Sequence, residues 1–213
     1  LRLTGPAEET LYDGTPAAGY GFDLWRAGEV VEDRRVLRLP RTLLPGDYTL
    51  WLTLDGVDCV ALAGMVVAPV SRSFAVPDMA SATHIDFVDD GGRGVRLWGY
   101  DLAPLIPGQP WPVTLAWQAL GEMDKDYVVF LHLRTAEADA PVLQGDTMPL
   151  QGSYPTSLWV SDEVVVDTHT LAPPTDLAPG DYVLYVGFYT PDGERLLAEG
   201  AYRAQLAEVQ VTP

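Results

Sequence analysis

Apolar and polar residues alternate with a period of two along most of the second half of this chain. Such alternation puts every second side chain on the same side of an extended strand and predicts β-structure with one buried face. No stretch shows a convincing helical period. The pattern predicts strands over 84–88, 93–101, 111–118, 126–134, 141–146, 162–171, 181–190 and 201–211.

Three of these strands carry an apolar residue at every second position, which marks the side facing a core. The 18 prolines and 20 glycines suit short strands joined by tight turns. The predicted inward residues are Val113, Leu115 and Trp117 in the first strand, Tyr127, Val129, Leu131 and Leu133 in the second, and Tyr182, Leu184, Val186 and Phe188 in the third.

A long internal duplication organises the chain. Residues 20–54 align with residues 154–188 without a gap, and about fifteen of the thirty-five positions are identical, including Pro-Gly-Asp-Tyr at 45–48 and 179–182. Residues 1–14 resemble 131–146 with a short gap, so the first copy has no counterpart of residues 82–129 or thereabouts. The first copy is therefore either a naturally reduced module or part of a longer protein that was cut inside its first module. The second interpretation is favoured.

The repeated turn predicts the type of fold. Pro-Gly sets a tight turn, and the tyrosine that follows begins an alternating strand. In immunoglobulin-like sandwiches a tyrosine at this corner packs inward and returns its hydroxyl to upstream backbone. Tyr48 and Tyr182 are therefore predicted to be structural anchors rather than catalytic phenols.

The predicted architecture is all-β, with tandem immunoglobulin-like antiparallel β-sandwiches of which the first is incomplete. The first copy, 1–69, keeps about five strands. A linker over 70–81 leads to a complete module of seven or eight strands over 82–213. The first module would expose sheet edges unless the second module, the linker or another chain covers them.

Charge narrows the range of partners. Lysine and arginine number 13 against 30 aspartates and glutamates, a formal net charge of −17. So acidic a surface repels phosphate, which argues against nucleic acid and anionic lipid. Its simplest role is solubility, although it could also attract cations.

Metal and cysteine chemistry have little support in the sequence. Cys59 is the only cysteine, so no intramolecular disulfide forms, and we expect a small core residue. His132 and His169 could approach each other across strands, but no metal-ligand spacing supports a site for them or for His84. No cofactor is predicted.

The acidic loop at 86–94 has two interpretations. Asp86, Asp89 and Asp90 could hold calcium through carboxylate oxygens, although their spacing does not fit an EF-hand. A plain hairpin turn is the favoured alternative.

Aromatic residues recur before a strand in both copies and are the candidate ligand-binding residues. Tyr154 and Trp159 in the second copy correspond to Tyr20 and Trp25 in the first. Aromatic faces at the edge of a sandwich can stack on sugar rings. The alternative is a loop that plugs the core with its own tryptophan, and the duplication favours it.

No catalytic motif is present. The chain lacks a nucleophile elbow, a recognisable Ser/His/Asp set and a glycine-rich phosphate loop. Thirty acidic residues leave open a glycoside hydrolase with an unrecognised carboxylate pair, which is the weakest hypothesis.

The second copy resembles a known module. The strings GYDL, PGQPWPVTLAWQAL, DYVVFLHL and YPTSLWVSDEVVVDTHTLAPPTDLAPGDYVLYVGF are similar to the β-sandwich appended after the membrane region of Chloroflexi-type dolichyl-phosphate-mannose-like glycosyltransferases and related surface proteins. The resemblance covers about 84–213, with a partial echo over 1–69. It implies an extracytoplasmic accessory domain without catalytic residues of its own.

These observations predict a non-catalytic module, outside the cytoplasm, that binds glycan or positions a parent glycosyltransferase. The alternative is a structural or protein-interaction module without a ligand, in which another region or chain completes the first copy. The chain contains no run of 18 apolar residues that could span a bilayer. It opens with neither a signal peptide nor a methionine, so we expect a piece of a longer protein. The resemblance implies that this longer protein is anchored in a membrane.

Overall fold

The computed structural model describes residues 1–14, 20–37, 39–54, 57–138 and 140–212. The chain divides into two compact units, unit 1 at Leu1–Ser71 and unit 2 at Arg72–Pro213. The division falls inside the segment predicted as a linker. No α-helix occurs in the part of the chain that the structure describes, which confirms the all-β prediction.

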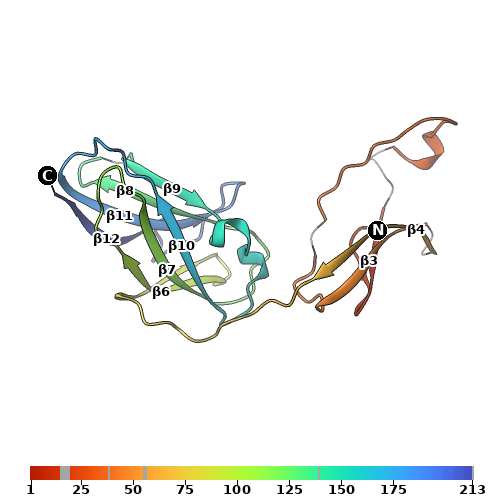
Figure 1. Cartoon of the computed structure of the whole chain (residues 1–213), viewed down its shortest axis with the longest axis horizontal. Helices are drawn as coiled ribbons and strands as arrows, with labels where there is room; N and C mark the ends of the chain where they lie inside the picture. Colours follow the sequence, from red (N-terminus) through yellow and green to blue (C-terminus); the bar gives the residue numbers. More distant parts are fainter. Residues whose placement is uncertain (15–19, 38, 55–56, 139, 213) are drawn as a thin grey trace. The chain divides into compact units, whose positions relative to one another are not determined.

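Unit 2 is a sandwich of two four-stranded antiparallel sheets (Figure 1). The first sheet has the order β10-β7-β6-β5 and the second the order β12-β11-β8-β9. All eight predicted strands are confirmed to within three residues at each end. They are β5 (Ser81–Val88), β6 (Gly94–Leu102), β7 (Trp111–Ala119), β8 (Val128–Thr135), β9 (Leu143–Thr147), β10 (Val164–Leu171), β11 (Gly180–Tyr189) and β12 (Ala204–Val211).

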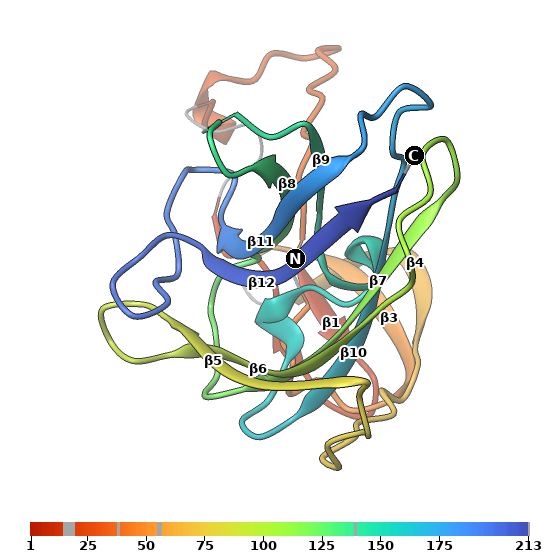
Figure 2. The same ribbon diagram turned by 90° about the vertical axis from the view of Figure 1, so that its left-hand side faces the viewer.

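The core of unit 2 lies between these two sheets. Figure 2 shows the pair β5–β6 and the pair β11–β12 in separate layers. The rings of Phe87 and Trp117 from one sheet meet Phe188 from the other, with centroids 5.5 and 4.9 Å apart in edge-on contact. All the inward residues predicted on 111–118, 126–134 and 181–190 are buried. The alternation therefore identified the core face of these three strands.

The repeated tyrosine forms the predicted corner in both units. The Tyr48 hydroxyl donates to the Leu44 carbonyl and the Tyr182 hydroxyl to the Ala178 carbonyl, each at 2.8 Å. Both rings are buried. Each tyrosine thus ties the start of a central strand to the backbone four residues upstream, as in immunoglobulin-like sandwiches.

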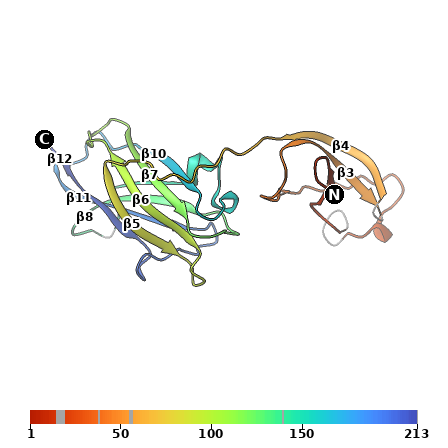
Figure 3. The ribbon, with the colours of Figure 1, turned by 90° about the horizontal axis from the view of Figure 1, so that it is seen from below.

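Unit 1 is a single four-stranded antiparallel sheet in the order β2-β1-β3-β4. Its strands are β1 (Arg2–Thr4), β2 (Glu9–Thr10), β3 (Gly46–Leu54) and β4 (Val57–Val67). Figure 3 shows β3 and β4 side by side as a curved hairpin. This order reproduces the second sheet of unit 2, with β1, β2, β3 and β4 in the places of β8, β9, β11 and β12.

The two sheets also share their register. Leu3 lies opposite Leu50 in unit 1, as Leu133 lies opposite Leu184 in unit 2. A bulge follows Leu50 in the β3–β4 ladder and Leu184 in the β11–β12 ladder. Since bulges fix where a strand twists, the two copies keep the same sheet geometry as well as the same sequence.

Two expectations for unit 1 are wrong. About five strands were predicted, but four form among the described residues, and 30–37 is not a strand although its counterpart is β10. The described residues of unit 1 include no equivalent of β7, the strand that pairs with β10. Cys59, predicted to be a small core residue, is exposed because it lies in an irregularity of the β3–β4 ladder, between Asp58 and Val60, where no residue of β3 is opposite it.

The tyrosine corner generates a stability prediction. Tyr182→Phe removes the hydroxyl that bonds the Ala178 carbonyl, and we expect a loss of about 1 kcal/mol in the free energy of unfolding. Urea denaturation measures this. The control is Tyr185→Phe on the outward side of β11, for which we expect less than about 0.5 kcal/mol. Equal effects of the two changes would contradict a specific role for the corner.

Candidate functional site

The predicted ligand residues Tyr154 and Trp159 flank a short 3₁₀ turn, η3 (Thr156–Leu158). The Trp159 indole nitrogen donates to the Tyr154 carbonyl at 3.0 Å, and the two rings stack with centroids 6.5 Å apart. Trp159 is 0% exposed and belongs to the core between the sheets. Its ring therefore presents no face to a ligand unless this corner opens.

Buried polar groups hold the same corner in place. The Tyr154 hydroxyl donates to Glu163 at 2.8 Å, and Arg72 donates to the Tyr154 hydroxyl at 2.6 Å and to the Leu158 carbonyl at 3.0 Å. Arg72 also forms an ion pair with Glu163, whose carboxylate is buried. Burial and the bond to Glu163 raise the pKa of Tyr154. A buried carboxylate needs such partners, so Arg72 is a structural counter-ion.

The first copy forms the same turn, but its tryptophan is not buried in a core. Tyr20 donates to Glu29 at 2.9 Å, and the Trp25 indole donates to the Tyr20 carbonyl at 3.3 Å across η1 (Phe22–Leu24). Trp25 is 38% exposed, in contrast to Trp159. The pattern Tyr-x₄-Trp-x₃-Glu thus specifies a local turn in both copies. The structure pairs Tyr20 with Trp25 and Tyr154 with Trp159, and a sugar-binding role for these residues stays a prediction.

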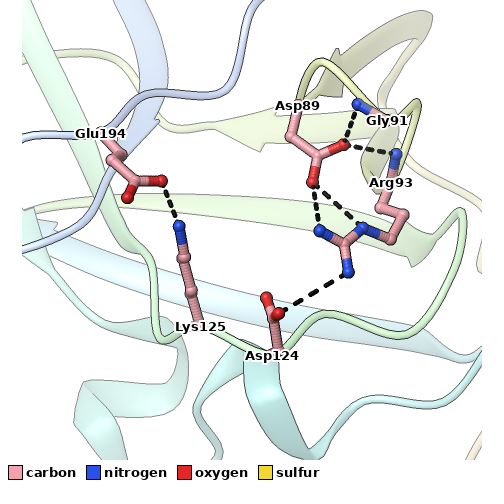
Figure 4. A network of polar contacts seen from close by, with 6 residues as sticks. All are labelled: Asp89, Gly91, Arg93, Asp124, Lys125 and Glu194. Atoms are coloured by element: carbon pink, nitrogen blue, oxygen red, sulfur yellow. Dashed lines mark hydrogen bonds and ion pairs between the residues drawn. The ribbon is translucent and has the colours of Figure 1, made fainter.

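The acidic loop forms the hairpin between β5 and β6. Asp89 accepts hydrogen bonds from the backbone amides of Gly91 and Arg93 at 2.8 and 2.9 Å, and its carboxylate pairs with the Arg93 guanidinium (Figure 4). Arg93 also lies 3.7 Å from Asp124. Burial alone would raise the pKa of Asp89, but these donors lower it. The Lys125–Glu194 ion pair forms beside this network.

Asp86 is also engaged by an arginine. Its two carboxylate oxygens accept from Arg96 at 2.6 and 2.8 Å, and this bidentate contact lowers the pKa of Asp86. Asp90 is exposed at the tip of the turn. Across the described ranges, no group of three or more His, Cys, Asp or Glu side chains is arranged to hold a metal ion.

A cleft of about 590 Å³ opens where β5 meets the 197–200 segment. Trp98, on the outward side of β6, lies beside it. The His84 ring meets the Trp98 ring edge-on at 4.3 Å, and the Trp98 indole donates to Gln118 at 2.8 Å. The residues that line the cleft include His84, Asp86, Asp89, Arg96, Glu199 and Gly200. The cleft thus combines oriented polar groups with a neighbouring half-buried tryptophan.

Trp98 was not among the residues predicted to bind a ligand, although the neighbouring His84, Asp86 and Asp89 were considered as possible metal ligands. The sequence feature that could have identified Trp98 is its place at an outward position of an alternating strand, between Leu97 and Gly99, which are buried. A bulge in the β6–β7 ladder falls at this point, between Leu97 and Gly99. Tryptophan on the solvent side of a sheet is a stronger indication of binding than tryptophan in a turn, because the core does not need it there.

The structure separates the two histidines considered as a pair. His169 points into the sandwich, where its Nε2 lies 2.6 Å from Asp167, and Asp167 also accepts the Leu150 amide at 2.9 Å. His132 lies in the other sheet, 3.1 Å from Asp146. Burial lowers the pKa of His132, although Asp146 opposes the shift.

A comparison with known protein families finds no match for this chain, and a comparison with curated proteins finds none either. No helix in the described segments has the length and hydropathy needed to cross a bilayer. The class that the structure itself defines is an all-β protein of antiparallel sheets.

The duplicated turn provides a matched test of burial. Trp159→Ala removes a fully buried indole, and we expect a loss of about 3–5 kcal/mol in the free energy of unfolding. Trp25→Ala, at the aligned position, should cost less than about 1.5 kcal/mol because that ring is partly exposed. Chemical denaturation measures both. Similar losses at the two positions would mean that the turns are equally covered in solution.

The lowered pKa of His132 leads to a prediction for how the free energy of unfolding depends on pH. The pKa of His132 is lowered on folding, so the unfolded chain binds the proton more tightly. The free energy of unfolding should therefore fall as the pH drops through about 6.5, the usual histidine value. Thermal unfolding of native and His132→Gln protein between pH 8 and 5 measures this. We expect a shallower fall in the variant, and parallel curves would contradict the prediction.

Proposed function

We propose that this chain is a non-catalytic accessory module of an extracytoplasmic protein, and that unit 2 binds glycan at the cleft beside Trp98. The observation that carries the proposal is the cleft itself. It brings polar side chains with fixed geometry next to an aromatic ring on the outward face of a sheet. Ligand sites in sandwich domains are concave and combine apolar rings with a few placed polar groups.

The geometry suits a sugar ring. The Trp98 ring supplies an apolar surface for the C–H groups of a pyranose. Asp86 and Arg96 form a planar pair that is oriented before any ligand arrives, and exposed His84 lies at the same edge. Sugar hydroxyls both donate and accept, so a carboxylate, a guanidinium and an imidazole together can satisfy them.

The resemblance to the module of dolichyl-phosphate-mannose-like glycosyltransferases supplies the biological setting of the proposal. In that setting the module would hold the acceptor glycan, or the transferase itself, outside the membrane. The all-β antiparallel structure is compatible with that family. The hydrolase hypothesis has the least support, because the carboxylates of Asp86 and Asp89 are each engaged by an arginine.

A structural or protein-interaction role is the second candidate. The specific observation in its favour is the single sheet of unit 1, which has the strand order of half a sandwich. A module of this kind would need no small ligand of its own.

A glycan array tests the first candidate. Purified chain is applied with and without calcium, together with Trp98→Ala, His84→Ala and the control Tyr202→Ala, which removes an exposed aromatic outside the cleft lining. We expect selective glycan binding that is lost in Trp98→Ala, weakened in His84→Ala and retained in Tyr202→Ala. Thermal unfolding of each variant checks that the fold survives.

The opposing outcome is equally clear. A native chain that binds no polysaccharide or lipid-linked sugar, or a Trp98→Ala protein that binds as well as the native chain, overturns the proposed site. Lost binding together with a collapsed unfolding transition would show that Trp98 supports the sheet instead. The milder Trp98→Phe variant, which keeps an aromatic ring, separates the two effects.

A further inference from the structure

The inner face of the unit 1 sheet is the face that a second sheet covers in unit 2. Leu54 aligns with Phe188, and their exposed fractions are 49% and 0%. Leu62 and Leu206 both lie in the bulge that follows the paired residues Leu50–Ala63 and Leu184–Ala207. The exposed fraction of Leu62 is 51%, while that of Leu206 is 7%.

The apolar residues at one end of this face are already buried. Leu3, Leu43 and Tyr48 form a small buried cluster. Their counterparts Leu133, Leu177 and Tyr182 occupy the corresponding end of the unit 2 core. Unit 1 therefore has the beginning of a sandwich core, and the apolar face beyond it is uncovered. A sheet with one apolar face is stable only when another layer covers it.

The segment 30–37 forms no strand in unit 1, but it aligns with a strand of the covering sheet in unit 2. Its counterpart β10 pairs with β7 along its whole length, from Val164 opposite Gln118 to Leu171 opposite Trp111. Val30 is 93% exposed, whereas the aligned Val164 is 4% exposed. One side-chain contact of β10 is nevertheless present in this segment. Asp33 accepts a hydrogen bond from Arg35 at 2.7 Å, and the aligned residues Asp167 and His169 lie 2.6 Å apart in β10.

The comparison between the two units defines what is absent. The covering sheet of unit 2 consists of β10 and the three consecutive strands β5, β6 and β7. Unit 1 has a sequence counterpart of β10 at 30–37, and its described residues form no counterpart of the other three strands. In unit 2 those three strands come directly before β8, which corresponds to β1.

We propose that the inner face of the unit 1 sheet docks a three-stranded antiparallel meander of the β5–β7 type, which pairs its last strand with residues 30–37. This proposal does not rest on the glycan-binding proposal. A second copy of unit 1 offers no such strand, because it carries the same sheet. The β5–β7 strands of unit 2 are committed to their own core, where Leu97, Val113 and Trp117 are fully buried.

The test adds the absent strands to the full chain. Residues 80–130 are duplicated and fused ahead of Leu1, so that Leu1 takes the place of Leu131. Hydrogen–deuterium exchange followed by mass spectrometry then compares the peptide over 29–37 in the fused and native chains. We expect exchange there to slow on the order of 100-fold, as for a paired strand, and binding of a hydrophobic dye to decrease.

Two controls make the result specific. A fused chain in which the added copies of Leu97, Val113 and Leu115 are changed to Ser keeps the outer residues but loses the apolar inner face, and it should give no protection. A fused chain with Leu54→Asp and Leu62→Asp should also give none. Protection in all three chains would show non-specific association.

Two outcomes overturn the proposal. In the first, exchange over 29–37 and dye binding are unchanged by the fusion. In the second, sedimentation shows that the native chain is already a dimer with β3, β4 and 29–37 protected, which would make a second copy the occupant. Neither outcome bears on the glycan array, so the two proposals fail independently.

Discussion

The central constraint on this chain is that an antiparallel sheet with one apolar face needs a second layer. Unit 2 meets it with two four-stranded sheets whose inner residues, from Phe87 and Trp117 to Phe188, pack into one core. The described residues of unit 1 form one of the two sheets, and their buried core is limited to the cluster around Leu3 and Tyr48. The copies differ accordingly at 30–37, which forms no strand, and at Trp25, which is partly exposed.

The local interactions that both copies of the repeat specify form with or without that second layer. The tyrosine corner and the Tyr-x₄-Trp-x₃-Glu turn form in both units with the same hydrogen bonds. Each involves residues no more than nine positions apart, so neither needs the missing sheet. Long-range elements behave differently, because β10 exists as a strand only through its pairing with β7. The duplication thus separates what the sequence specifies locally from what tertiary pairing adds.

The same distinction explains what the sequence could predict. Alternation located all eight strands of unit 2 and the inward residues of the three strands for which they were predicted. The prediction of about five strands for unit 1 exceeded the four that its described residues form, because the sequence pattern of a strand gives no sign that its partner strand is absent. The candidate site was harder: Tyr154 and Trp159 were noticed because they recur, yet recurrence marks a structural turn. Trp98 was missed because the contacts of its outward ring with His84 and Gln118 join three strands.

Hydrogen exchange of the native chain, comparing the aligned peptides 29–37 and 164–171, tests the half-sandwich most directly. Both peptides carry related sequences, so intrinsic exchange is similar and the difference reports pairing. We expect 29–37 to exchange within seconds, near the rate of an unprotected chain, while 164–171 is protected to the level of the unit 2 core. Equal and strong protection of both peptides would contradict the account, because it would mean that unit 1 already has its second layer.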